Sequence, residues 1–427
     1  MFAGLAFPGA AAHDFSNAIP DMITTEEALA IIRGSIRATS GVESVPLGQA
    51  SGRVLAQDAA ADSDIPPFDR ATVDGYAVVS SDGGGTYPVV EDVPAGAFPK
   101  VRVTPGSVSK IMTGAPLPEG ADAVVPVEET GGFVGVGEKA RINKKIAPGK
   151  NVSPKGEDAK TGSVVLRRGA VIRPQEIAVL AAVGISQAPV LRLPSVGVLA
   201  TGDELVEPPA VPGPGQIRNS NGPSTTAMAG AMGLLPVNLG VARDDEASLQ
   251  TAIRRGMDFD FLLLSGGVSS GDRDLVPAVL ARLGYKILFH KVKIKPGKPT
   301  LFGVSPGGGY VFGLPGNPVS GMVIFELFIR PALALFMGAP AGGMEVEARL
   351  LTGFKRKNAE REEYLPARIW WEDDGFSAEL IEYHGSGHFT ALTRANGLVK
   401  IPVGVKTASA GRDVTARFLG DRLAPAP

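Results

Sequence analysis

Cysteine is absent from the 427-residue sequence. Its absence excludes disulfides, thiolate zinc sites, iron–sulfur clusters and cysteine nucleophiles. A surplus of either charge is also lacking, because 42 Lys and Arg residues stand against 44 Asp and Glu residues. A protein that binds nucleic acid through its phosphates needs a cationic excess, so we expect no nucleic-acid partner. Charged residues make up only 20% of the chain and hydrophobic residues 44%, which excludes a disordered polyampholyte and allows sizeable cores.

A basic leader and an uninterrupted membrane span are lacking as well. The apolar opening of the chain has no basic start and is broken by Pro8, which favours a flexible tail over a signal peptide. The most lipid-like stretch, residues 318–337, contains Glu326, Arg330 and Pro331 and is typical of a buried core helix. We therefore expect a cytoplasmic protein that does not enter a membrane.

Glycine (55) and proline (35) are abundant, which suits a chain of many turns and short strands. Near the start, TTEEALAIIRGSIR predicts an amphipathic helix with Thr24 or Thr25 as its N-cap. The patterning divides the chain into five expected parts: a flexible tail (1–22), a linking domain that includes this helix (23–64 and 163–192), a small β domain (65–162), a central α/β domain (193–340) and a C-terminal β-barrel or sandwich (341–427). The expected fold class is thus multidomain, α/β plus β.

The central part alternates strand-like and helix-like segments, and its three βα repeats predict a doubly wound, mostly parallel sheet. Ligands of such sheets bind beyond the carboxyl ends of the strands. The residues that follow the expected strands are acidic, basic or turn-forming, and we expect them at one edge: Glu204, Asp244, Ser265, Gly266, Gly267, Asp274, Lys291, Lys295, Lys298, Pro315 and Pro318.

This set of residues suits an anionic ligand. The SGGVSSG turn can direct backbone N–H groups at an anion, and lysines are point charges for phosphate or another oxyanion. Carboxylates beside phosphates are what Mg²⁺ requires, and the candidates are Glu204, Asp244 and Asp274. Each signal alone also fits a structural role, as a turn, an N-cap or a solvated face. Their convergence on one edge favours a site.

Two further motifs lie outside the central part. The string PPFDRATVDGYAV contains Asp74-Gly75, which by itself fits a hairpin turn. His384 and His388 are four residues apart on an expected β ribbon, a poor spacing for metal ligands. Structural or phosphate-contacting roles are favoured for these two histidines.

Taken together, eight ordered strings between Pro66 and Ser320 resemble the MoeA family, the molybdopterin molybdotransferases that share their fold with the E domain of gephyrin. The strings are PPFDRATVDGYAV, IMTGAPLPEGADAVVPVEE, KGED, VGVLATGDEL, RDD, LLSGGVSSGDRD, KIKPGKP and GLPGNPVS. The resemblance implies that molybdate replaces AMP on adenylylated molybdopterin with the help of Mg²⁺, in the final step of molybdenum cofactor biosynthesis. It also implies a molybdopterin-binding type of α/β domain, a C-terminal β-barrel and an elongated homodimer.

The resemblance further assigns roles to individual residues. The active site would lie between subunits, and a partner subunit would present Asp69 and Thr113 with the support of Asp158. Glu204, Asp244 and Asp274 would organise Mg²⁺ and the adenylyl phosphates. The remaining roles are oxyanion binding and shaping of the pocket: Ser265, Gly266, Gly267, Lys291, Lys295, Lys298, Pro315, Pro318, Ser320, Arg361 and Ser386. An upstream molybdopterin adenylyltransferase and downstream maturation proteins for molybdoenzymes are the expected protein partners.

Two alternatives stay open from the sequence. A CinA-like nucleotide pyrophosphatase or amidase shares a TGDE-type turn and would hydrolyse a phosphoanhydride with water. A non-catalytic scaffold, as in the clustering role of gephyrin, would need no intact site.

Overall fold

The computed structural model describes residues 22–268 and 275–420. It divides into two compact units. The first combines the N-terminal segment up to Gly41 with the chain from Leu191 onward, and the second is Val42–Val190. Each unit is described by itself.

The first unit contains a six-stranded sheet in the order β15–β12–β16–β20–β19–β17. The strands are β15 (Val237–Ala242), β12 (Val196–Thr201), β16 (Phe261–Ser265), β20 (Tyr310–Leu314), β19 (Leu301–Val304) and β17 (Lys286–Phe289). The first four are mutually parallel, whereas β19 is antiparallel to both of its neighbours. The prediction of a mostly parallel sheet is confirmed, and β12, β16, β20 and β17 all point their carboxyl ends toward one edge.

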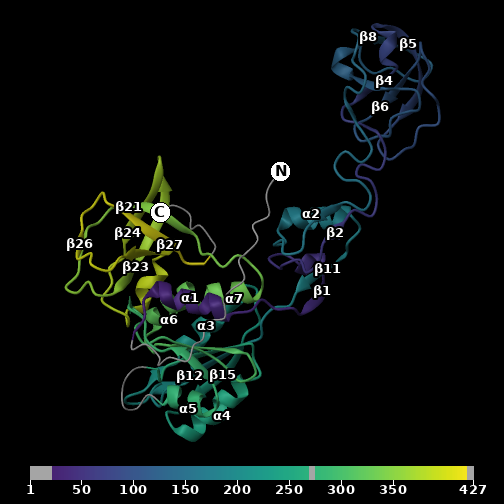
Figure 1. Cartoon of the computed structure of the whole chain (residues 1–427). Helices are drawn as coiled ribbons and strands as arrows, with labels where there is room; N and C mark the ends of the chain where they lie inside the picture. Colours follow the sequence, from purple (N-terminus) through teal and green to yellow (C-terminus); the bar gives the residue numbers. More distant parts are fainter. Residues whose placement is uncertain (1–21, 269–274, 421–427) are drawn as a thin grey trace. The chain divides into compact units, whose positions relative to one another are not determined.

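Helices cover both faces of this sheet (Figure 1). One face packs against α1 (Thr25–Ser35), α3 (Asn221–Gly230), α6 (Pro318–Ile324) and α7 (Arg330–Phe336), and the other against α4 (Glu246–Gly256) and α5 (Val276–Arg282). Strands covered on both faces are buried along their length, as β12 is at all six positions.

Two of these helices test expectations from the sequence. Thr24 caps α1 through a reciprocal capping box with Glu27, as predicted. α1 packs in the core of the α/β unit, where it contacts α7, rather than with the linking segments to which the sequence assigned it. The other expected boundaries remain predictions. Pro318–Phe336 is long and apolar enough to cross a membrane, but 89% of that window is buried inside the structure, which identifies it as a core helix.

The C-terminal part is a closed barrel of five strands, which decides between barrel and sandwich. The strands are β23 (Glu362–Glu372), β24 (Gly375–Leu380), β21 (Glu345–Leu350), β27 (Asp413–Phe418) and β25 (Gly397–Ile401), and β25 pairs back onto β23. A short strand from the α/β part, β18 (Ile294–Lys295), joins the same sheet beside β23. Residues 291–298, which contain four lysines, are thus joined to the barrel by backbone pairing.

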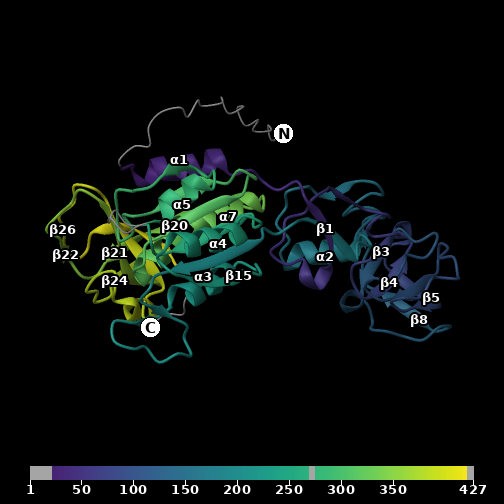
Figure 2. The ribbon, with the colours of Figure 1, turned by 90° about the horizontal axis from the view of Figure 1, so that it is seen from below.

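The second unit is built of short strands around small cores (Figure 2). Its largest sheet has the order β7–β4–β6–β5–β8, with β7 at Ala123–Pro126, β4 at Gly75–Val78, β6 at Val108–Ile111, β5 at Gly85–Val93 and β8 at Lys139–Ile142. A second core joins β1 (Val42–Pro46), β2 (Ala59–Ala60), β10 (Val164–Leu166), β11 (Gln187–Leu191) and α2 (Pro174–Ala182). α2 opens with Pro174, because the first turn of a helix does not need the backbone N–H that proline lacks.

Candidate active site

A pocket of about 460 Å³ lies at the carboxyl ends of β12, β16 and β20. We call it the strand-edge pocket. It is lined by Thr201, Glu204, Leu205, Ile217, Asn221, Asp244, Ser265, Gly266, Gly267, Val268, Pro299, Pro315, Gly316 and Asn317. The structure thus brings together most of the acidic and turn-forming residues predicted for this edge, whereas Asp274 lies outside the described residues.

The turn after β16, which lines this pocket, packs closely against the two neighbouring strands. Gly266 has a φ of +94°, and a Cβ added there would stand 2.3 Å from the carbonyl oxygen of Thr201. Its N–H donates to the carbonyl of Leu314 at 3.0 Å. Only glycine fits this position, because the backbone is left-handed and the neighbouring strand is in contact. Contacts with β12 and β20 therefore fix the position of this turn.

Two hydroxyl groups in the strand-edge pocket have no partner. Thr201 Oγ1 and Ser265 Oγ are buried without a hydrogen bond, and their residues are only 3% and 4% exposed. A buried hydroxyl without a partner costs free energy, so a ligand that supplies one is favoured.

The same pocket offers carboxylates that fit Mg²⁺. They belong to Glu204 and Asp244, and carboxylate oxygens are the hard donors that Mg²⁺ prefers. Among the described residues, no group of three Asp, Glu or His side chains is close enough to hold a metal by itself. Mg²⁺ commonly takes one or two carboxylates and completes its shell with phosphate and water, so the residues fit such a site.

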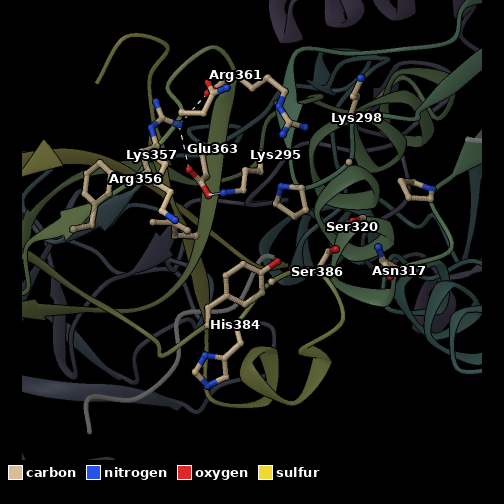
Figure 3. Close-up of a pocket in the computed structure, with 18 of the residues that line it drawn as sticks. Lys295, Lys298, Asn317, Ser320, Arg356, Lys357, Arg361, Glu363, His384 and Ser386 are labelled. Atoms are coloured by element: carbon tan, nitrogen blue, oxygen red, sulfur yellow. Dashed lines mark hydrogen bonds and ion pairs between the residues drawn. The ribbon is translucent and has the colours of Figure 1, made fainter. Parts of the chain in front are cut away.

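A larger groove of about 770 Å³ lies between the α/β part and the barrel (Figure 3). We call it the cationic groove, because six cationic side chains and one carboxylate line it: Lys295, Lys298, Lys355, Arg356, Lys357, Arg361 and Glu363. Ser320, which is 3% exposed, and Ser386 add hydroxyl groups. The cationic excess matches an oxyanion with more than one negative charge.

Tyr383 adds a neutral donor to the lining of the groove. Burial raises the pKa of its hydroxyl to about 12, and the negative charge of Glu363 acts in the same direction. The hydroxyl is buried without a hydrogen-bond partner. It therefore stays protonated at neutral pH.

The two cavities are contiguous, since Pro299, Pro315 and Asn317 line both. Two predicted site residues lie elsewhere. Lys291 lines neither cavity, and its carbonyl accepts from the N–H of Ile23 at 3.1 Å. Pro318 lines a third, more apolar hollow of about 630 Å³ that Asn317 also borders.

The second unit gathers its predicted residues around β3 (Arg70–Ala71). Asp69 accepts from the N–H of Lys155 at 2.7 Å, and Asp158 pairs with Arg70 at 3.7 Å. The N–H of Gly114 donates to the carbonyl of Ala71, which places the Thr113 loop beside the same strand. Asp69, Thr113 and Asp158 are all exposed.

The alternative of a hairpin at Asp74-Gly75 is wrong, because β4 pairs with the later strands β6 and β7. A Cβ on Gly75 would stand 1.9 Å from the carbonyl oxygen of Val125, so close strand contact requires this glycine. Asp74 accepts from the N–H and hydroxyl of Thr113 at 2.7 and 2.6 Å. The hydroxyl bond and then the backbone bond hold the pKa of Asp74 below its ordinary value.

Several groove residues were missed in the sequence. Lys355, Arg356 and Lys357 form a KRK run that resembles a solvated face, and Glu363 is one acid among several. The signal that could have found them is the change from the charged residues to the strand that begins at Glu362. The run lines the same groove as Lys295 and Lys298 only because the barrel folds back onto the α/β part.

An open α/β sheet whose edge continues into a cation-lined groove is typical of proteins that bind anionic ligands. Descriptions of known families match the chain in three consecutive parts. The MoeA N-terminal region (domain I and II) matches residues 23–184, the probable molybdopterin binding domain matches 197–335, and the MoeA C-terminal region (domain IV) matches 347–419.

Individual relatives agree over most of the chain. The molybdopterin molybdenumtransferase of Staphylococcus aureus is 35% identical over 379 residues, 87% of this chain and 89% of its own. Molybdopterin molybdenumtransferase 2 of Mycobacterium tuberculosis is 35% identical over 405 residues, 91% and 98% of the two chains. The crystal structure of the molybdopterin biosynthesis MoeA protein from Pyrococcus horikoshii has a TM-score of 0.79 at 34% identity and covers 93% of this chain and all of that one. The chain belongs to the MoeA family, and it is a transferase.

Proposed function

We propose that the protein exchanges the AMP of adenylylated molybdopterin for molybdate with the help of Mg²⁺, as the final step of molybdenum cofactor biosynthesis. The observation that carries this proposal is the continuity of the cationic groove with the strand-edge pocket. The names of the Staphylococcus and Mycobacterium relatives support molybdopterin as the acceptor and molybdenum as the transferred group.

Charge is the obstacle that the cationic groove overcomes. Molybdate is a dianion and the adenylylated pterin is also anionic, so the two reactants repel each other in water. Lys295, Lys298 and Arg361 neutralise the oxyanion, and the hydroxyls of Ser320 and Ser386 donate to its oxygens. The groove thereby raises the local concentration of molybdate next to the pterin.

The strand-edge pocket holds the adenylyl phosphates in this proposal. The turn at Gly267 lies next to the phosphates, while the N–H of Gly266 stays bonded to the carbonyl of Leu314, and Thr201 and Ser265 supply hydroxyl donors. Mg²⁺, when bound, supplies polarisation of the phosphoanhydride. We propose Glu204, Asp244 and Asp274 as its protein ligands. Water attacks the phosphoanhydride, so that AMP and the pterin phosphate separate. The two dithiolene S–H groups of the pterin replace one oxygen of molybdate, and that oxygen leaves with their two protons as water.

We further propose a homodimer in which Asp69, Thr113 and Asp158 of one subunit complete the site of the other. Exposure of all three residues on one edge of the β domain supports this role. Lys291 and Pro318 would act from the margins of the site. A molybdopterin adenylyltransferase would deliver the substrate, maturation proteins would take the product, and the cytoplasm is the proposed compartment.

The two alternatives have less support. A nucleotide pyrophosphatase or amidase would need water at the strand-edge pocket but no oxyanion groove formed by a C-terminal barrel. A scaffold would need neither the unpartnered hydroxyls nor the six cations. Both features are explained by transfer of an oxyanion to an anionic acceptor.

The test is reconstitution of the full chain with adenylylated molybdopterin and Mg²⁺, with and without molybdate. We expect AMP release and metal-loaded pterin only when molybdate is present. AMP release that is independent of molybdate would support the hydrolase and contradict the transferase. Asp69→Ala should abolish product while circular dichroism and the dimer mass stay unchanged. An active Asp69→Ala variant would contradict the shared site.

A further inference from the structure

Glu363 is the one carboxylate in the lining of the cationic groove, and it is nearly inaccessible at 4% exposed. Its Oε1 lies 2.7 Å from Lys295 Nζ, and its Oε2 lies 3.2 Å from the NH1 of Arg356 (Figure 3). A buried carboxylate is tolerated only when paired and hydrogen-bonded, and both oxygens of Glu363 meet that condition. Each oxygen serves a different cation.

Arg356 lines the groove but directs its donors into the barrel. Its Nε donates to the carbonyl of Val405 at 2.7 Å, its NH2 to that of Pro402 at 2.5 Å and its NH1 to that of Arg361 at 2.9 Å. All three nitrogens are therefore engaged, and Arg356 is only 9% exposed. Arg356 holds the backbone of Arg361 and does not serve as an anion ligand.

The backbone pairing of β18 with β23 also holds Lys295 next to Glu363. Lys295 lies opposite Glu363 and Ile294 lies opposite Glu362 in the parallel register. Arg361 NH1 donates to the carbonyl of Ile294 at 3.3 Å. One short ladder, in which Glu363 is the partner of Lys295, thus fixes both the lysine of the α/β part and the arginine of the barrel.

Simple electrostatics makes a carboxylate in this place unfavourable. Its negative charge repels an oxyanion in the groove and offsets part of the cationic excess. A benefit other than charge must explain its position. That benefit is a lower entropic cost of binding. A flexible, unpaired lysine loses side-chain entropy when it binds an anion, whereas a lysine already held by a carboxylate has lost most of that entropy on folding.

We propose that Glu363 is a positioning residue for the oxyanion. It fixes the Lys295 ammonium through Oε1 and, through Arg356, the backbone that carries Arg361, before the anion arrives. Glu363 itself does not touch the oxyanion. This inference rests on the proposed function and names the residue that preorganises its oxyanion site.

The test is calorimetric titration of the full chain with sodium molybdate, in the absence of pterin. Glu363→Gln removes the charge but keeps the shape, so electrostatics alone predicts tighter binding, whereas positioning predicts binding at least ten-fold weaker. Glu363→Asp keeps the charge but shortens the reach by one methylene, so electrostatics alone predicts unchanged binding and positioning again predicts weaker binding. The two variants therefore distinguish a positioning role of Glu363 from the effect of its charge. Either variant is sufficient if the other does not fold.

Glu362→Gln is the matched control. Glu362 lies one residue away, outside the groove lining, where it pairs with Lys400 at 3.0 Å and accepts from Tyr364 at 2.8 Å. We expect its molybdate affinity to stay within two-fold of the unmodified chain, even if its melting temperature falls. Equal or tighter binding by Glu363→Gln, or unchanged binding by Glu363→Asp, would overturn the positioning role while the oxyanion site stands. An unmodified chain that binds no molybdate would overturn the site and this inference together.

Discussion

The cationic groove and the strand-edge pocket share a wall but differ in how their polar groups are satisfied before a substrate binds. In the groove, Glu363 accepts from two cations and Arg356 uses all three of its nitrogens. In the strand-edge pocket, the hydroxyls of Thr201 and Ser265 are buried without a partner. The charged groups at the centre of the groove are thus paired in advance, although its Tyr383 hydroxyl has no partner, whereas in the strand-edge pocket two hydroxyls are left for a ligand to complete.

This difference follows the chemistry of the two ligands. A tetrahedral oxyanion is small and has no hydrophobic part, so the groove must replace its hydration shell with charges that are already in place. A phosphate with a bound cation brings its own charge and donors. A pocket for such a ligand can leave hydroxyls without a partner at a modest cost in stability.

Within the two cavities, the largest expected effect comes from removing a cation of the groove. Lys298→Ala should raise the molybdate concentration needed for half-maximal transfer by about 10- to 100-fold, because a charge-assisted contact contributes about 1.5–3 kcal/mol. Steady-state assays with varied molybdate measure it. The control is Lys293→Ala, an exposed lysine of the same run outside the groove lining, which should stay within two-fold. Equal losses in both variants would mean that the lysine run acts as a diffuse charge.

The next effect should appear in the strand-edge pocket and leave the groove intact. Glu204→Gln should raise the Mg²⁺ concentration for half-maximal AMP release by about ten-fold, the equivalent of about 1.4 kcal/mol. Its calorimetric affinity for molybdate should not change. Glu207→Gln, an exposed acid nearby that lines neither cavity, is the control. A parallel loss of molybdate affinity would show that the two cavities are not separate sites.

The amino-terminal edge of the same sheet offers a contrast, because its charges are structural. Asp260 accepts two hydrogen bonds from Arg192, at 2.6 and 2.7 Å, and two from Ser195, both at 2.8 Å. Asp260→Asn should lower the free energy of unfolding by about 1–3 kcal/mol. Urea denaturation measures this, and the affinity for molybdate should stay unchanged. A loss of affinity at matched stability would make that edge part of the site.

Asp260 also predicts a pH dependence. Burial opposes its ionisation, but the bonds from Arg192 and Ser195 outweigh burial and hold its pKa below the ordinary value. A carboxyl whose folded pKa is depressed stabilises the fold above its unfolded pKa, and this contribution is lost as pH falls through the folded pKa. Stability of the unmodified chain should therefore fall below about pH 4, and Asp260→Asn should show a shallower decline.

The sequence predicts the strand-edge pocket better than the groove, for a physical reason. Glu204 and Asp244 follow parallel strands and Ser265 ends one, and the ends of parallel strands meet at one edge of the sheet regardless of loop length. Thr24 was equally predictable, since a capping box is a local signal. The groove depends instead on the pairing of Lys295 with Glu363, which are far apart in the sequence. The spacing of hydrophobic residues within a segment gives no information on such a long-range pair.

The hairpin expected as one alternative at Asp74-Gly75 was wrong for the same reason. The strand that begins at Gly75 finds its partners more than thirty residues later, at β6 and β7. Dipeptide turn signals describe the chain within four residues and carry no information on such pairing. The roles of Asp69, Thr113 and Asp158 stay predictions because they depend on a second subunit.

The smallest expected effect tests the claim that the strand-edge pocket is incomplete on its own. Thr201→Val removes a buried hydroxyl without a partner and keeps the shape, so the free energy of unfolding should rise by about 1 kcal/mol while AMP release slows. Thr300→Val is the matched control, since Thr300 is fully buried and its hydroxyl donates to the carbonyl of Gly297 at 2.6 Å. That variant should lose stability, because the carbonyl is left unpaired. If both variants lose stability alike, Thr201 already has a partner in solution, such as a bound water, and the contrast between the two cavities disappears.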